Sequence, residues 1–135
     1  MKRAIQVMTR EILRILDGQE PSLYLFGSVT MDDFHLGWSD IDFLCLTKRP
    51  ISPAQREELV PLRQTLLKTE PGNPYYRSFE GGMLSLDAFL TGKPEPAVYW
   101  GTSGQRVTEN YRFDCFSIVE LLEFGVLLAG RMYAP

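Results

Sequence analysis

Two short stretches decide the expected fold: LYLFGS at residues 23–28 and SDIDFL at residues 39–44. The first is an apolar run that ends abruptly at Gly27, which is typical of a buried strand followed by a turn. The second leads into the apolar run of residues 41–47, which predicts another strand. Eleven residues separate Ser28 from Asp40. The pattern therefore predicts two buried strands joined by a polar loop that contains a short helix or turn.

The residues at these strand ends have the chemistry of a phosphate and metal site. Gly27 has no Cβ, so backbone N–H groups can approach an anion, and Ser28 adds a hydroxyl donor. Asp40 and Asp42 are two positions apart, which places both carboxylates on one face of an extended chain. Adjacent carboxylates repel unless cations lie between them, and oxygen ligands suit Mg²⁺. Either motif alone is common in turns and caps, but together they indicate nucleotide and metal binding.

The remaining pattern predicts an α+β protein with one domain over residues 1–135. Helices are expected over residues 2–17, from Ser52 and Pro53 towards Lys68, and over residues 113–129; strands are expected over residues 22–26, 41–47 and 82–89. Gln55 completes a capping box with Ser52, and Pro61 is expected to kink or break that helix. Residues 91–104 are predicted to form a loop, with 97–100 as an alternative edge strand. These elements fit a small mixed β-sheet flanked by helices on one side.

Composition narrows the class of protein. The formal net charge of −3 argues against a dedicated nucleic-acid binder, and no apolar run or leader pattern indicates a membrane protein. Cys45 and Cys115 lie in apolar surroundings without a CxxC pair, which favours reduced, buried thiols in a cytoplasmic protein. His35 is the one histidine, so this chain cannot supply chemistry that needs two imidazoles.

The sequence FGS at residues 26–28, followed by SDID at residues 39–42, resembles the signature of the nucleotidyltransferase (polymerase-β-like) superfamily. Within that superfamily the chain is most similar to the catalytic domain of aminoglycoside adenylyltransferase-like proteins. The resemblance implies an enzyme that transfers a nucleoside monophosphate, AMP from ATP, to a hydroxyl acceptor and releases pyrophosphate. It implies that Gly27 and Ser28 hold the triphosphate and that Asp40 and Asp42 ligate two Mg²⁺ ions. Glu80 would be the third carboxylate, acting as a general base or as a further metal ligand.

The third carboxylate has two candidates, Glu80 and Asp87. Glu80 precedes the pair Gly81-Gly82, which is unusual inside a catalytic strand, while Asp87 is expected in the same strand. The two are seven positions apart, so they would face opposite sides of an unbroken strand. A glycine bulge could change that parity. Glu80 is the favoured candidate.

The acceptor and the partner stay open at this point. The similar adenylyltransferases have a second, helical domain that builds much of the acceptor pocket, and no such domain is predicted in this chain. One alternative is an enzyme that completes its pocket with a second copy or a partner. Another is an antitoxin-like minimal nucleotidyltransferase that binds and nucleotidylates a helical toxin. A non-catalytic nucleotide-binding module is the third, although a charged Asp-x-Asp motif in a buried strand argues against it.

Overall fold

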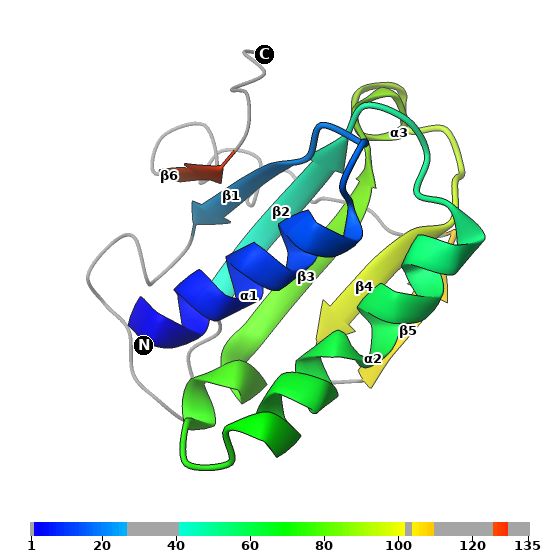
Figure 1. The fold of residues 1–135 in the computed structure, drawn as a ribbon. Coiled ribbons are helices and arrows are strands. Elements are labelled where there is room, and N and C mark those ends of the chain that lie inside the picture. The colour runs from blue at the N-terminus through cyan, green and yellow to red at the C-terminus, as the bar shows by residue number, and fades with distance from the viewer. Residues whose placement is uncertain (1, 27–40, 102–103, 110–125, 130–135) are drawn as a thin grey trace.

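The computed structural model describes residues 2–26, 41–101, 104–109 and 126–129, which form a mixed sheet with helices against it (Figure 1). The sheet has six strands in the order β5-β4-β3-β2-β1-β6. The strands are β1 Ser22–Phe26, β2 Ile41–Thr47, β3 Phe79–Ser85, β4 Ala97–Gly101, β5 Gly104–Thr108 and β6 Val126–Ala129; the helices are α1 Lys2–Ile15, α2 Pro53–Thr69, α3 Leu86–Thr91 and the 3₁₀ helix η2 Pro74–Ser78. Strands β2 and β3 run parallel, and the other neighbours run antiparallel. The predicted α+β fold class with a mixed sheet is confirmed.

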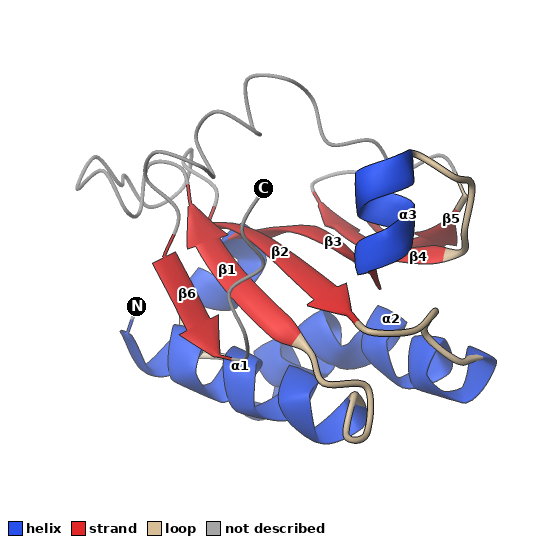
Figure 2. Ribbon diagram, turned by 90° about the horizontal axis from the view of Figure 1, so that it is seen from above, coloured by secondary structure: helices blue, strands red, loops and turns tan. Residues whose placement is uncertain are grey.

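The two faces of the sheet are covered differently. Helices α1 and α2 lie on one face, and the short helix α3 lies on the other (Figure 2). The larger core fills the first face, which we call the α1/α2 face, and includes Ile41, Phe43 and Cys45 of β2. Alternate residues Leu44 and Leu46 pack with Ala88 of α3 on the opposite face, the α3 face. The expectation that the helices cover one side holds for α1 and α2 and is wrong for α3.

Helix α2 forms the crossover between the parallel strands, and its start agrees with the sequence. Ser52 Oγ accepts a hydrogen bond from the Gln55 backbone N–H at 3.2 Å, and the Gln55 side chain accepts one from the Ser52 N–H at 3.2 Å. This is the predicted capping box. The helix runs through Pro61 to Thr69. Of the two predicted effects of Pro61, a break is therefore wrong, and a kink stays a prediction.

Arg63 of α2 is a buried charged side chain that binds backbone carbonyls. Its side chain is part of the interior, with 7% of the residue exposed. The guanidinium donates to the carbonyls of Tyr76 at 3.0 Å and Gly101 at 3.3 Å, and also to that of Arg77. A guanidinium has five N–H donors in a rigid fork, which suits several carbonyls at once. Arg63 therefore ties α2 to the segment that enters β3 and to the end of β4.

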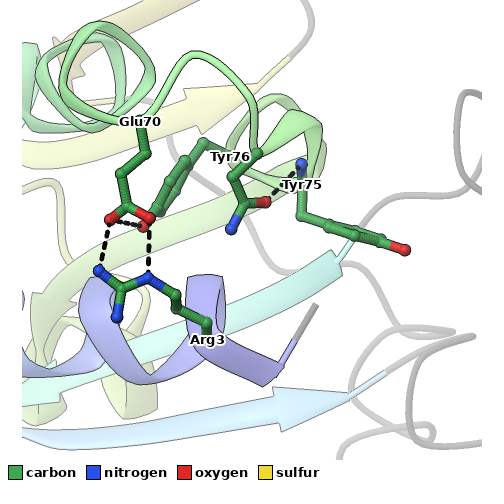
Figure 3. A network of polar contacts seen from close by, with 5 residues as sticks. Arg3, Glu70, Tyr75 and Tyr76 are labelled. Atoms are coloured by element: carbon green, nitrogen blue, oxygen red, sulfur yellow. Dashed lines mark hydrogen bonds and ion pairs between the residues drawn. The ribbon is translucent and has the colours of Figure 1, made fainter.

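A surface network joins the start of α1 to the end of α2 (Figure 3). Arg3 donates from Nε to Glu70 Oε1 at 2.8 Å, and the Tyr76 hydroxyl donates to Glu70 Oε2 at 3.0 Å. The Arg3 guanidinium, with the Tyr76 hydroxyl as a smaller contributor, holds the pKa of Glu70 below its usual range. The contacts fix the two helices relative to η2, which leads directly into β3.

Three sequence expectations need correction. The predicted strand over residues 82–89 is β3 followed by α3, because Ser85 Oγ accepts from the Ala88 N–H at 3.1 Å and caps the helix. Strand β4 is not an edge strand, since β5 pairs along its outer side. Residues Val126–Ala129, expected at the end of a helix, form β6 and pair with β1; pairing with a neighbouring strand overrides local helical periodicity. The rest of that predicted helix, and the segment 29–39, lie outside the described residues.

Candidate active site on the α3 face

The site begins with two carboxylates on neighbouring parallel strands. The register of β2 and β3 pairs Asp42 with Glu80. Their neighbours Ile41, Phe43 and Phe79 pack into the core of the α1/α2 face, and successive side chains of a strand point to opposite faces. Asp42 and Glu80 therefore both project from the α3 face, on strands about 4.8 Å apart.

Both carboxylates remain within reach of solvent. Asp42 and Glu80 are half-buried in strands whose other residues are buried. They lie near the starts of β2 and β3, whereas the apolar cluster under α3 is built from Leu44, Leu46 and Leu84, further along these strands. Helix α3 thus covers the later part of the two strands and not the positions of the carboxylates.

The end of β1, which leads into the first half of the sequence motif, lies beside Asp42. Phe26, the last residue of β1, is the register partner of Asp42. Gly27 and Ser28 follow Phe26 in the sequence, and Asp40 precedes Ile41. These three predicted site residues, and His35, lie outside the described residues. The pairing shows that the strand leading to Gly27 and the strand carrying Asp42 are direct neighbours.

Asp87, the alternative third carboxylate, is placed elsewhere. It lies in the first turn of α3, where it is exposed. The expectation that it shares a strand with Glu80 is wrong, because the Ser85 cap ends β3 before it. Glu80 is the candidate that shares a face with Asp42, and its role as the third carboxylate stays a prediction.

The glycine after Glu80 is explained by the approach of the two strands. A Cβ built on Gly81 would lie 2.1 Å from the backbone oxygen of Phe43. Atoms cannot approach so closely, so a larger residue would push β3 away from β2. The glycine that looks unusual beside a predicted catalytic carboxylate allows β3 to lie close to β2.

The donor set suits a hard cation. Two carboxylates at paired positions repel each other unless a cation or a proton neutralises them, and Mg²⁺ prefers such oxygen ligands. Within the described ranges, no group of three or more histidine, cysteine, aspartate or glutamate side chains could hold a metal. As carboxylates on one face of the sheet, Asp42 and Glu80 fit part of a Mg²⁺ site. The predicted further ligand, Asp40, lies outside the described residues.

The sequence pattern did not link two further side chains, Tyr99 and Arg106, to Glu80. The Tyr99 hydroxyl of β4 donates to Glu80 Oε1 at 3.4 Å, and the guanidinium carbon of Arg106 lies 4.6 Å from the centroid of the Tyr99 ring. Tyr99 and Arg106 are register partners in β4 and β5. Their positions on either side of Gly101 and Gly104 in the sequence were the available signal, but this spacing becomes informative only once the two strands are known to pair.

Cys45 is excluded as a nucleophile. It is fully buried in the core of the α1/α2 face, and burial raises the pKa of its thiol to about 12. The thiol is therefore protonated at neutral pH and inaccessible, as the sequence predicted for Cys45. Cys115 lies outside the described residues.

Comparison with known proteins supports the superfamily. Residues 8–71 match the model of the nucleotidyltransferase domain family, a range that includes Gly27, Ser28, Asp40 and Asp42 and ends before Glu80. No curated protein matches the chain. None of the described helices is long and apolar enough to cross a membrane. The family match, together with the mixed sheet and its flanking helices, confirms the predicted resemblance to the nucleotidyltransferase superfamily.

Proposed function

We propose that the chain transfers a nucleoside monophosphate, AMP from ATP, to a hydroxyl acceptor and releases pyrophosphate. The observation that carries the proposal is the pairing of Asp42 with Glu80 on the α3 face, beside the end of β1. This arrangement brings two carboxylates to the strand that leads into the Gly27-Ser28 motif. The choice of ATP rests on the resemblance to adenylyltransferase-like proteins.

Each residue has a defined part in this proposal. Gly27 and Ser28 hold the triphosphate with backbone N–H groups and a hydroxyl donor. Asp42 and Asp40 hold Mg²⁺, which when bound neutralises charge on the phosphates. The acceptor oxygen attacks the α-phosphorus, the bond to the bridging oxygen breaks and pyrophosphate leaves. Glu80 accepts the proton of the acceptor hydroxyl or contributes a further metal ligand.

The acceptor is a small molecule or a protein that approaches over the α3 face. In the antitoxin-like alternative, a helical partner would be that acceptor, and a second copy of the chain would complete the pocket in the homodimer alternative. Incubation with labelled ATP, CTP, GTP and UTP separates these cases when small hydroxyl compounds and co-purifying proteins are offered as acceptors. The labelled product identifies the class of acceptor, and pyrophosphate release identifies the nucleotide.

Calorimetry of Mg²⁺–ATP binding tests the metal assignment directly. We expect Asp42→Ala to lose binding, since it removes a proposed ligand to the metal that the nucleotide shares. Glu80→Gln should retain ATP binding and lose transfer by about 100-fold or more, within the range for a general base. Asp87→Asn is the matched carboxylate control and should behave like the parent chain. Unchanged Mg²⁺–ATP binding in Asp42→Ala would overturn the assignment.

A further inference from the structure

We propose that Tyr99 is a positioning residue for the Glu80 carboxylate, and that Gly101 and Arg106 hold the Tyr99 ring in the required orientation. The inference rests on the proposed function, because it gives Tyr99 a task only where Glu80 acts on the acceptor or on the metal. It concerns residues beyond the 8–71 range of the family match.

The Tyr99 side chain occupies space that is open because Gly101 has no Cβ. A Cβ built on Gly101 would lie 1.9 Å from the Tyr99 hydroxyl oxygen and 2.3 Å from the ring carbon that bears it. Residues two apart in a strand share a face, so the phenol lies along β4 in the space that a side chain at position 101 would fill. A larger residue at that position would force the ring away.

The register between β3 and β4 explains why the Tyr99 side chain extends towards Glu80. Strands β3 and β4 pair Gly82 with Tyr99 and Gly81 with Trp100, and Glu80 and Gly101 come next on their strands. A ring that lies along β4 towards Gly101 therefore extends towards Glu80. The Tyr99 hydroxyl reaches Glu80 Oε1 at 3.4 Å, from the β4 side, opposite the side on which Asp42 lies.

Arg106 covers the ring from the next strand. Its guanidinium carbon lies 4.6 Å from the ring centroid, within the range of about 6 Å for a cation–π contact. The pairing of Tyr99 with Arg106 places both on the α3 face. The Tyr99 ring thus lies against the backbone at Gly101 and beside the Arg106 guanidinium.

This arrangement counters the repulsion between the two carboxylates. A Glu80 side chain with free rotamers would move away from the charge of Asp42. A donor on the far side fixes its orientation, in the way that outer hydrogen bonds orient metal-binding or catalytic groups. The contact is longer than a typical O–H···O bond of about 2.7–2.8 Å. We therefore expect loss of the Tyr99–Glu80 hydrogen bond to have an effect near the lower end of the range of about 10–100-fold for such outer partners.

The test uses two variants that disturb Tyr99 in different ways. Tyr99→Phe removes the hydroxyl and keeps the ring, whereas Gly101→Ala keeps the hydroxyl and displaces the ring. Gly101→Ala should leave folding intact, because the contact is with the far end of a movable side chain. Gly72→Ala is its matched control, since a Cβ there would meet nothing within 4 Å. Urea unfolding verifies the stability of every variant.

Two readouts are measured: the affinity for Mn²⁺ alone, by electron paramagnetic resonance of the free ion, and the kinetics of pyrophosphate release from Mg²⁺–ATP. We expect each variant to lower kcat by about 10-fold, with KM for Mg²⁺–ATP unchanged. If Glu80 is a metal ligand, the affinity for Mn²⁺ should fall by a similar factor; if it is a general base, that affinity should not change. The two changes combined should cost no more than the larger of them alone, because both act through one hydroxyl. In the Glu80→Gln background, Tyr99→Phe should have no further effect on kcat.

The outcomes separate this inference from the proposed function. Parent-like Mn²⁺ affinity and kcat in Tyr99→Phe, with transfer lost in Glu80→Gln, would overturn the role of Tyr99 and leave the proposed function standing. A raised KM with unchanged kcat would also overturn it, because Tyr99 would then bind the nucleotide. Full transfer by both Asp42→Ala and Glu80→Gln would overturn the proposed function itself. Absence of Mn²⁺ binding by the parent chain would overturn the metal assignment and the inference together.

Discussion

The two faces of the sheet carry different residues on the same strands. On the α1/α2 face, β2 and β4 contribute Phe43 and Trp100, whose rings meet edge to face with centroids 5.5 Å apart. On the α3 face, the neighbouring positions of these strands contribute Asp42 and Tyr99. Alternation along a strand therefore separates two tasks: the α1/α2 face supplies the larger apolar core, and the α3 face presents polar groups beside a smaller apolar cluster.

This difference explains how half-buried carboxylates persist near the middle of a sheet. Two like charges at paired positions cost stability, and a small domain has about 5–15 kcal/mol in total. The packed α1/α2 face can offset that cost. We therefore expect substitutions on one face to change folding and substitutions on the other to change chemistry.

The largest expected effect is on the α1/α2 face. Trp100 is fully buried, and its Nε1 donates to the Leu59 carbonyl at 2.9 Å. We expect Trp100→Ala to lower the free energy of unfolding by about 3–5 kcal/mol, since it leaves a cavity and removes the hydrogen bond to the Leu59 carbonyl. Urea unfolding followed by circular dichroism measures this loss of unfolding free energy. Leu90→Ala, at a position that is 65% exposed, should change stability by less than about 0.5 kcal/mol; equal losses would contradict the comparison.

The second prediction tests whether Arg63 of helix α2 supports the residues on the α3 face. Arg63→Ala leaves the carbonyls of Tyr76 and Gly101 without this donor, and we expect a loss of about 2–4 kcal/mol in unfolding free energy. Because Gly101 underlies Tyr99, kcat should also fall at temperatures where the variant remains folded. Arg56→Ala is the control: Arg56 is half-buried and donates to the Ile51 carbonyl at 2.7 Å. Its loss should be about 0.5–1.5 kcal/mol with kcat unchanged.

The third prediction has the opposite sign. Glu80→Gln removes one of two like charges at paired positions while keeping an oxygen that can accept from Tyr99. In the absence of divalent metal, we expect the free energy of unfolding to rise by about 0.2–1 kcal/mol. Addition of Mg²⁺ should reduce or reverse the advantage, because bound metal stabilises the parent chain. A loss of stability in metal-free buffer would show that the charges do not repel.

The smallest effect is expected at the exposed network around Glu70. Its pKa is lowered by Arg3, so the folded chain binds the proton of this carboxyl less tightly than the unfolded chain. The stabilisation is therefore present above the unfolded pKa, about 4.3, and is lost as pH falls through the lower folded value. Unfolding free energies of Glu70→Gln and the parent chain, compared between pH 7 and pH 3, should converge at the acid end. A difference in unfolding free energy that stays constant between pH 7 and pH 3 would contradict the lowered pKa of Glu70.

Much of the fold could be predicted from local pattern. The apolar runs gave β1 and β2 at their exact bounds, and the Ser52–Gln55 box fixed the start of α2. The misses have a common physical cause, which is that pairing between distant segments outweighs local preference. Residues Val126–Ala129 show it, since a helical spacing there yields to pairing with β1. The strand expected to reach Phe89 ended early because Ser85 caps a helix.

The sequence by itself determined the predicted chemistry of the site: the Gly27-Ser28 and Asp40-Ile41-Asp42 motifs indicate a nucleotidyltransferase because residue type and spacing are local properties. Only the tertiary structure decided which later carboxylate lies level with Asp42 on the α3 face. Glu80 does so because β2 and β3 run parallel in that register, with Gly81 allowing their close approach. Tyr99 and Arg106 reach the site for the same reason. Register between strands depends on packing across the whole sheet, and no local pattern encodes it.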